Sequence, residues 1–272
     1  MSEGNQREHL EQLAEIYSEE RHGLYAALDE TSNPQGPRSL NELALGILTT
    51  GSRILDAGCR NAAHLIQLTS ASGCTGVGID PLLTHVQQAI RLVDTAGVGV
   101  SVTIERGIIE RLPHRSASFD FVWCRDVLTL VDDLDLVLIE FKRVLSSDGH
   151  ILIYLNTASD LLEPLEADRL NRPLGNVAAN MQRERIEHGI ARAGLAISDV
   201  REIGTEWREY EEERTRPVSD DLLKLARLRR RKGDLVSRFG QEAYDSAEAS
   251  LHWLCYQLLG KLKPMMYVLR HA

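Results

Sequence analysis

Two acidic residues each follow a short apolar segment in the first third of the sequence. Asp56 ends the segment 53–56 and is followed by a turn that contains Gly58, and Asp80 ends the segment 76–80. In a doubly wound sheet, ligands bind where the strands end and the next helices begin. A carboxylate at the end of the second strand is placed to accept hydrogen bonds from both hydroxyls of a ribose. The two acids therefore predict a ligand site at neighbouring strand ends.

These acids belong to a run of alternating apolar strands and amphipathic helices. The predicted strands are 53–56, 75–80, 100–105, 119–124, 150–155, about 196–203 and 265–269. Predicted helices at about 61–71, 82–96, 134–145 and 183–193 connect them, with a turn at 146–149. Short connections of this kind give a parallel sheet with right-handed crossovers. The predicted fold class is α/β, a Rossmann-like, doubly wound, seven-stranded and mostly parallel sheet with helical cap elements.

The remaining segments divide the chain into four parts. We expect an N-terminal helical cap at 1–50, a cofactor-binding core at 51–203, a helical insertion at 204–263 and a final core strand at 264–272. Residues 5–30 and the insertion both show apolar residues at helical spacing. The insertion is predicted to be a lid over a ligand site. A helical pair that widens the core or forms a dimer interface is the alternative.

Composition excludes several classes of protein. The net charge of −9 argues against a nucleic-acid partner, and no apolar run is long enough to span a membrane. Residues 1–20 lack the basic start and apolar core of a signal peptide. The four cysteines and nine histidines show no metal-ligand or redox spacing, so no metal is expected. These features predict a cytoplasmic protein with reduced thiols and leave a homodimer open.

The order of the motifs resembles that of a known family. The matching pieces are 54–59 (Ile-Leu-Asp-Ala-Gly-Cys), 78–80 (Gly-Ile-Asp), 107–113 (Gly-Ile-Ile-Glu-Arg-Leu-Pro), 118–122 (Ser-Phe-Asp-Phe-Val), 143–145 (Arg-Val-Leu) and Gly149. Together they resemble the class I S-adenosylmethionine-dependent methyltransferases, in the branch that acts on small molecules. The resemblance covers about residues 50–156 and the closing strand.

The resemblance implies S-adenosylmethionine as cofactor, S-adenosylhomocysteine as product and a small-molecule acceptor as partner. Gly58 would let the backbone approach the methionine part, Asp80 would hold the ribose, and Ile108 with Ile109 would flank the adenine. The full predicted cofactor set is Asp56, Gly58, Cys59, Arg60, His64, Asp80, Pro81, Ile108, Ile109, Cys124 and Arg125. The alternatives are that Gly58 only makes a tight turn and that Asp80 only caps a helix before Pro81.

The first motif departs from the family pattern. The family usually continues it with two more glycines, whereas this chain has Arg60, Asn61 and Ala62 after Cys59. Arg60 and His64 add side chains that could reach the methionine carboxylate, or both could point to solvent. Ile108 stands where the family usually offers an acid to the adenine. Adenine recognition would then fall to backbone groups and apolar contact.

The expected reaction is methyl transfer to a small organic acceptor by in-line displacement. The candidate catalytic residues are Asp126, which follows the fourth strand, and His22 and Tyr25 from the N-terminal cap. A base helps only if the nucleophile carries a proton that must leave, so an electron-rich acceptor could need none. The main alternative is a methyltransferase-like fold that catalyses another reaction or serves as a binding scaffold.

Overall fold

The computed structural model describes residues 3–16 and 19–272, and the chain divides into two compact units. The first unit, Met1–Gln35, contains helices α1 (Glu3–Ile16) and α2 (Glu19–Leu28). The second unit, Gly36–Ala272, contains the sheet and all other helices of the described residues. Helix α3 (Arg38–Ile47), which the sequence prediction placed in the N-terminal cap, belongs to this second unit.

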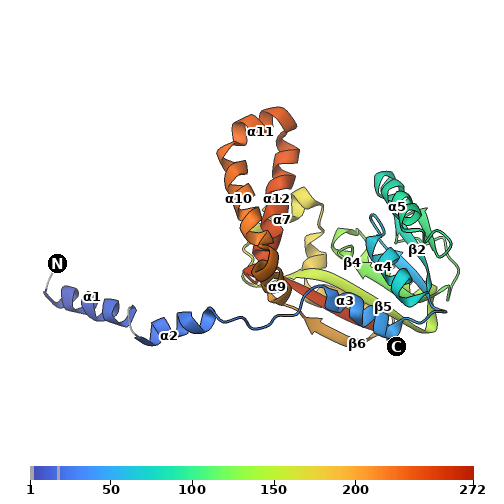
Figure 1. Cartoon of the computed structure of the whole chain (residues 1–272), viewed down its shortest axis with the longest axis horizontal. Helices are drawn as coiled ribbons and strands as arrows, with labels where there is room; N and C mark the ends of the chain where they lie inside the picture. Colours follow the sequence, from blue (N-terminus) through green and yellow to red (C-terminus); the bar gives the residue numbers. More distant parts are fainter. Residues whose placement is uncertain (1–2, 17–18) are drawn as a thin grey trace. The chain divides into compact units, whose positions relative to one another are not determined.

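In the described part of the chain, seven strands form one sheet in the order β3-β2-β1-β4-β5-β7-β6 (Figure 1). The first five in sequence pair in parallel, and β7 is antiparallel to both β5 and β6. The strands are β1 (Arg53–Ala57), β2 (Thr75–Asp80), β3 (Val102–Arg106), β4 (Phe119–Arg125), β5 (Leu145–Ala158), β6 (Leu195–Glu202) and β7 (Leu262–His271). The predicted α/β fold class is confirmed.

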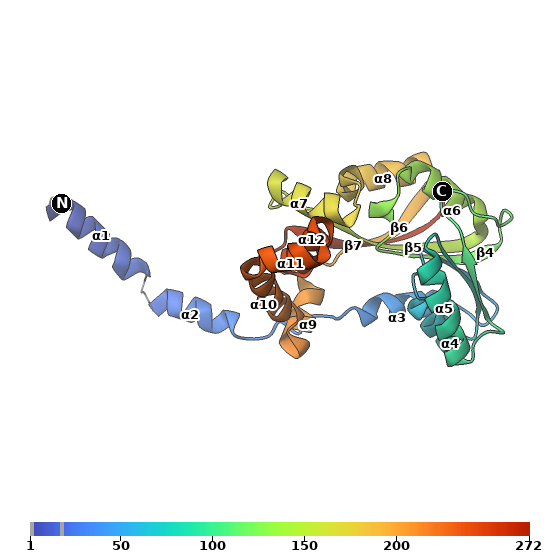
Figure 2. The same ribbon diagram turned by 90° about the horizontal axis from the view of Figure 1, so that it is seen from above.

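Two helical layers cover the sheet because its strands alternate buried side chains between the two faces. Helices α3, α4 (Ala63–Ser72) and α5 (Leu83–Ala96) lie on one face, and α6 (Leu134–Val144) and α8 (Arg183–Arg192) on the other (Figure 2). Phe121 and Trp123 of β4 pack on the α3–α4 side, whereas Val122 and Cys124 pack on the α6–α8 side. The central strand β4 is therefore buried on both faces.

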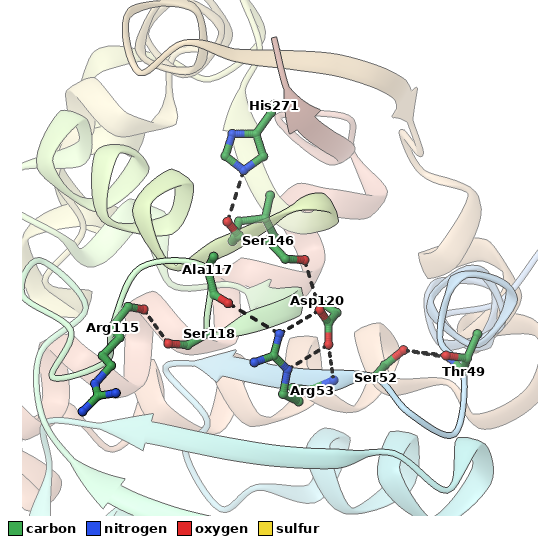
Figure 3. A network of polar contacts seen from close by, with 10 residues as sticks. Thr49, Ser52, Arg53, Arg115, Ala117, Ser118, Asp120, Ser146 and His271 are labelled. Carbon is green, nitrogen blue, oxygen red and sulfur yellow. Dashed lines mark hydrogen bonds and ion pairs between the residues drawn. The ribbon is translucent and has the colours of Figure 1, made fainter.

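The amino-terminal edge of the sheet is held by a polar network around Asp120 (Figure 3). The backbone nitrogen and Nε of Arg53 both donate to Asp120 Oδ2 at 3.0 Å, and Arg53 Nη2 donates to Asp120 Oδ1 at 3.0 Å. Ser146 Oγ donates to the same Oδ1 at 3.0 Å. This network ties β1, β4 and β5 together at the edge opposite the strand ends that carry Asp56 and Asp80.

One local prediction is wrong. Residues 146–149 were predicted to be a turn, but they lie inside β5. Leu145 pairs with Phe119 and His150 pairs with Phe121, so the extra residues form an irregularity in the β4–β5 ladder. The serine and glycine content of this segment indicates a turn, yet pairing with β4 keeps the chain in the sheet as a bulge.

The helices that belong to neither layer form a separate group near β5 and β7. Between β6 and β7 the chain forms α9 (Glu206–Thr215), α10 (Pro217–Arg230), α11 (Lys232–Phe239) and α12 (Gln241–Leu258). Helix α12 packs against α10, α11 and also α7 (Pro164–Leu174), which lies between β5 and α8 (Figures 1 and 2). Helices α7, α10 and α12 share an apolar cluster that contains Leu170, Val218, Cys255 and Tyr256, together with Met181 and Leu262.

Candidate active site

A cavity of about 590 Å³ opens where β1, β2 and β4 end. After β3 the chain returns to place β4 beside β1, so these strand ends form the switch point at which α/β sheets bind ligands. Ten of the eleven predicted cofactor residues line the cavity, together with Asp126. Cys124 is the exception: its side chain is fully buried in the core and does not line the cavity.

The turn after β1 is tied to the end of β2. The backbone nitrogens of Gly58 and Cys59 donate to the Ile79 carbonyl at 2.9 and 3.0 Å, and the Arg60 nitrogen donates to Asp80 Oδ2 at 3.0 Å. Gly58 has φ +77°, and a Cβ on it would lie 2.4 Å from Val127 Cγ2. Only glycine suits this position on both counts.

Arg60 and Ala62 occupy the positions of the two glycines that this motif lacks, and both have a positive φ, as a glycine could. Their φ angles are +49° and +59°, in the left-handed region that costs a side chain roughly 1–2 kcal/mol. Asp126, at the end of β4, also has a positive φ of +56°. Strained residues of this kind cluster at ligand sites, and two of these three, Arg60 and Asp126, line the cavity, whereas Ala62 is buried.

Asp80 and Asp56 both line the cavity, but their carboxylates differ in the hydrogen bonds that they accept. Asp80 accepts hydrogen bonds from the nitrogens of Arg60 and Leu82 and from His85 Nδ1 at 3.1 Å. Asp56 is 3% exposed, and no hydrogen bond to its carboxylate is found within the described residues. Burial, and secondarily the charge of Asp80, raises the pKa of Asp56 to about 7. Asp56 is therefore a nearly buried carboxylate of this cavity for which the described residues supply no hydrogen-bond partner.

His64 and Arg125 form a pair on the other wall. Arg125 Nη1 donates to His64 Nε2 at 2.9 Å, so His64 is neutral with its proton on Nδ1. Burial and the neighbouring Arg125 charge lower the pKa of His64 to about 4. Its ring tilts against Trp123, with centroids 5.6 Å apart. His64 is therefore uncharged, and it holds the cationic side chain of Arg125 in position.

Asp126 sits in a recess next to this pair. Its Oδ1 accepts a hydrogen bond from Asn156 Nδ2 at 3.0 Å, and Asn156 Oδ1 accepts one from Gln257 Nε2 at 2.5 Å. Asn156 and Gln257 are almost completely buried, whereas 48% of the Asp126 side chain is exposed. Desolvation in the recess nevertheless raises the pKa of Asp126 to about 6, although Arg125, Asn156 and the buried Arg208 act in the opposite direction. A carboxylate with this pKa can take up a proton near neutral pH.

The other catalytic candidates lie in the first unit. Tyr25 is in α2. His22 also falls within α2, and its side chain lies outside the described part of the chain. Their assignment to the acceptor site stays a prediction.

Sequence reasoning missed several residues of the site. Trp123 and His85 line the cavity, and Gln257 reaches Asp126 through Asn156. The position of Trp123 in the sequence could have predicted that it lines the site, since it lies two residues before Arg125 at the end of a predicted strand. No sequence pattern could have predicted the role of Gln257, because its partner, Asn156, is 101 residues away along the chain.

The described residues contain no group of three or more His, Cys, Asp or Glu side chains that could hold a metal ion. Within residues 3–16 and 19–272, no helix combines the length and the apolar character needed to cross a membrane.

Comparisons with known proteins agree with this geometry. Residues 55–153 match the family described as "Methyltransferase domain". The 27-O-demethylrifamycin SV methyltransferase of Amycolatopsis mediterranei is 25% identical over 195 residues, which cover 70% of this chain and 72% of that protein.

Two solved structures share the fold. The [4+2]-cyclase SpnF has a TM-score of 0.67 at 19% identity, covering 86% of this chain and 80% of SpnF. A geranyl diphosphate methyltransferase in complex with SAM has a TM-score of 0.64 at 15% identity, covering 86% and 85% of the two chains. The family match over residues 55–153, at the ends of whose strands the switch-point cavity opens, identifies a methyltransferase domain in this chain, and the two solved structures share its fold.

Proposed function

We propose that the cavity at the ends of β1, β2 and β4 holds S-adenosylmethionine, with Asp80 accepting hydrogen bonds from the ribose hydroxyls. The observation that carries this proposal is the convergence of Asp56, Asp80 and the Gly58 turn on one cavity. Its volume of about 590 Å³ falls in the range of roughly 300–1,000 Å³ for small-molecule sites. Ile108, which is 52% exposed, offers an apolar surface for the adenine.

The charged ends of the cofactor fit the two groups described above. The Asp56 carboxylate, to which the described residues donate no hydrogen bond, suits an ammonium group. The Arg125 guanidinium suits a carboxylate, which arginine commonly binds through two parallel hydrogen bonds. His64 holds Arg125 in place for this role. Arg60 is exposed at the rim and could add a second contact to the same carboxylate.

When bound, the cofactor supplies an electrophilic sulfonium methyl group. The part of the chain is then to orient the acceptor, exclude water and remove a proton if the nucleophile carries one. Asp126 is the base that the geometry favours: it lines the cavity, and its Oδ1 is oriented by Asn156. An acceptor hydroxyl or amine beside Asp126 would transfer its proton to the carboxylate.

The helices between β6 and β7, with α7, are proposed to cover the acceptor side of the cavity. Two residues of α12 support this: Gln257 reaches Asp126 through Asn156, and Trp253 lines a smaller cavity together with Asp126. The contribution of residues 5–30 stays a prediction. So do the cytoplasmic location, which rests on composition, and a homodimer, which rests on the helical insertion as a possible interface.

A second function is favoured by one observation. SpnF, which shares the fold at a TM-score of 0.67, is described as a [4+2]-cyclase and not as a methyltransferase. The altered first motif of this chain, with Arg60 and Ala62 in place of glycines, is compatible with a cofactor retained only to support the structure. The fold alone does not separate the two functions.

Transfer of a labelled methyl group separates them. The protein is incubated with methyl-tritiated S-adenosylmethionine and small-molecule fractions of a cell extract, beside an Asp126→Asn variant. Label in an extract fraction, lost with Asp126→Asn, supports methyl transfer with Asp126 as base. Tight cofactor binding with no transfer to any fraction favours the second function, and transfer that survives Asp126→Asn removes the base.

A further inference from the structure

A second cavity, of about 280 Å³, adjoins the cofactor cavity. The two share Asp126 and Leu130 as wall residues. The other walls of the smaller cavity come from Thr129 and from three residues of distant elements: Leu174, Asn176 and Trp253. A molecule in this cavity would lie against the carboxylate that also faces the cofactor.

The wall that carries Asn176 is built firmly into the core. The Val177 nitrogen donates to the Thr129 carbonyl at 2.7 Å, and the Asn176 nitrogen donates to the Asn171 carbonyl at 2.9 Å. The buried Asn180 amide donates to the carbonyls of Leu128 and Val131 at 3.0 and 2.8 Å. Four hydrogen bonds therefore hold the segment around Asn176, and three of them go to residues 128–131, at the short helix η1 (Leu128–Leu130).

The side chain of Asn176 has unused hydrogen-bonding capacity. Its amide nitrogen is buried and makes no hydrogen bond to any residue that the structure describes. Buried amide groups in folded proteins are nearly always paired, so an unpaired one needs an explanation. Rotation of the amide about its last side-chain bond presents either its nitrogen or its oxygen to the cavity, and a ligand there would satisfy it.

The remaining walls set the character of that ligand. Leu130 and Leu174 are apolar, and Trp253 offers a flat aromatic face. Asp126 is the one ionisable side chain among the residues that line this cavity. No lining cation is available to neutralise an anionic group, and an anion would meet the Asp126 carboxylate.

We propose that this smaller cavity is the acceptor site, and that it takes a flat organic molecule that carries no anionic group and has a carbonyl-type group held by Asn176. In this arrangement the ring lies against Trp253, and the nucleophilic hydroxyl or amine faces Asp126. The proposal rests on the proposed function, because the acceptor must lie beside the cofactor cavity. Asn176 and Trp253 are then the residues that determine specificity.

The test uses two probes of the same shape, acetophenone and ethylbenzene, which differ in the carbonyl oxygen. Binding to the full chain in the presence of S-adenosylhomocysteine is followed by saturation-transfer NMR. Wild-type protein is expected to bind acetophenone more tightly. Asn176→Ala should weaken acetophenone about fivefold, the equivalent of one neutral hydrogen bond, and leave ethylbenzene unchanged. Trp253→Ala should weaken both probes, whereas Trp253→Phe should retain them.

S-adenosylhomocysteine affinity, measured on each variant, serves as the control for folding and for the cofactor cavity. Equal acetophenone binding by wild type and Asn176→Ala, with normal S-adenosylhomocysteine affinity, would overturn the proposal. The same holds if wild type binds neither probe. If S-adenosylhomocysteine does not bind to wild type, the proposed function is contradicted, and the acceptor-site proposal, which depends on it, is contradicted as well. Should Asn176→Ala not fold, Asn176→Leu, which has a similar volume and lacks both polar atoms, carries the same expectation.

Discussion

Gly58→Ala tests the geometry of the turn that forms the floor of the cofactor cavity. The new Cβ would have two separate costs. The φ of +77° places an alanine in the left-handed region, at about 1–2 kcal/mol. The Cβ would also lie 2.4 Å from Val127 Cγ2 and 3.0 Å from Cγ1, and overpacking of this kind costs about 1–3 kcal/mol. The expected loss of unfolding free energy is therefore about 2–5 kcal/mol, the sum of these two ranges.

Gly97→Ala is the matched control. Gly97 has a similar φ of +68°, but nothing lies within 4 Å of its Cβ position. It carries the backbone cost alone, and both substitutions gain the same small amount from a less flexible unfolded chain. Urea unfolding followed by circular dichroism should therefore show a larger loss for Gly58→Ala by about 1–3 kcal/mol.

The steric part can be isolated with Val127→Ala. Because this change removes both contacting methyl groups, Gly58→Ala should cost less in the Val127→Ala background than in wild type, a coupling that a double-mutant cycle measures. If Gly58→Ala and Gly97→Ala lose equal stability, or if the cycle shows no coupling, the close approach of the turn to Val127 is not what requires glycine.

Three further predictions concern charge and hydrogen bonding at the site. Because burial raises the pKa of Asp56 to about 7, this carboxyl group is protonated in the free enzyme at pH 6. A bound ligand with an ammonium group should stabilise the ionised carboxylate, so that Asp56 releases its proton on binding. S-adenosylhomocysteine binding should release about one proton at pH 6 and almost none from Asp56 at pH 8.5, measured by calorimetry in buffers of different ionisation enthalpy; Asp56→Asn should remove the release. Arg60→Gly keeps the left-handed backbone and removes only the side chain, so it should weaken S-adenosylhomocysteine more than adenosine, and equal losses for both ligands would exclude Arg60 as a carboxylate contact. Gln257→Leu removes the donor that anchors Asn156, so the pKa of Asp126 should rise further above its value of about 6; an unchanged titration of carbon-13-labelled Asp126 in NMR would contradict this.

The parts of the fold that depend on local pattern could be predicted from the sequence. The bounds of β2, residues 75–80, agree with the prediction because a short apolar run between two turns has few alternative structures. The acids at the ends of β1 and β2 follow from the same reasoning, since parallel strands end at one edge. The prediction of residues 146–149 failed where pairing with β4 outweighs a turn-forming composition.

The interior of the site depends on contacts that local pattern does not encode. Arg125 and His64 are 61 residues apart in sequence, so local pattern could not predict the hydrogen bond that makes His64 a neutral partner of Arg125; the contact of His64 with the methionine carboxylate stays a prediction. The strained backbone of Arg60 and Ala62 was also hidden, because neither residue type favours a positive φ. In both cases tertiary structure imposes a conformation that the residue alone would not adopt.

Isothermal titration calorimetry of S-adenosylhomocysteine tests the central claim most directly. Wild type should bind it, and Asp80→Ala should bind it about 5- to 150-fold more weakly, the equivalent of about 1–3 kcal/mol for hydrogen bonds to a carboxylate. Asp120→Asn, at the opposite edge of the sheet, is the matched control and should leave the affinity unchanged. Circular dichroism confirms that each variant is folded. Absence of binding to wild type, or equal affinity for wild type and folded Asp80→Ala, would contradict the assignment of the cofactor site.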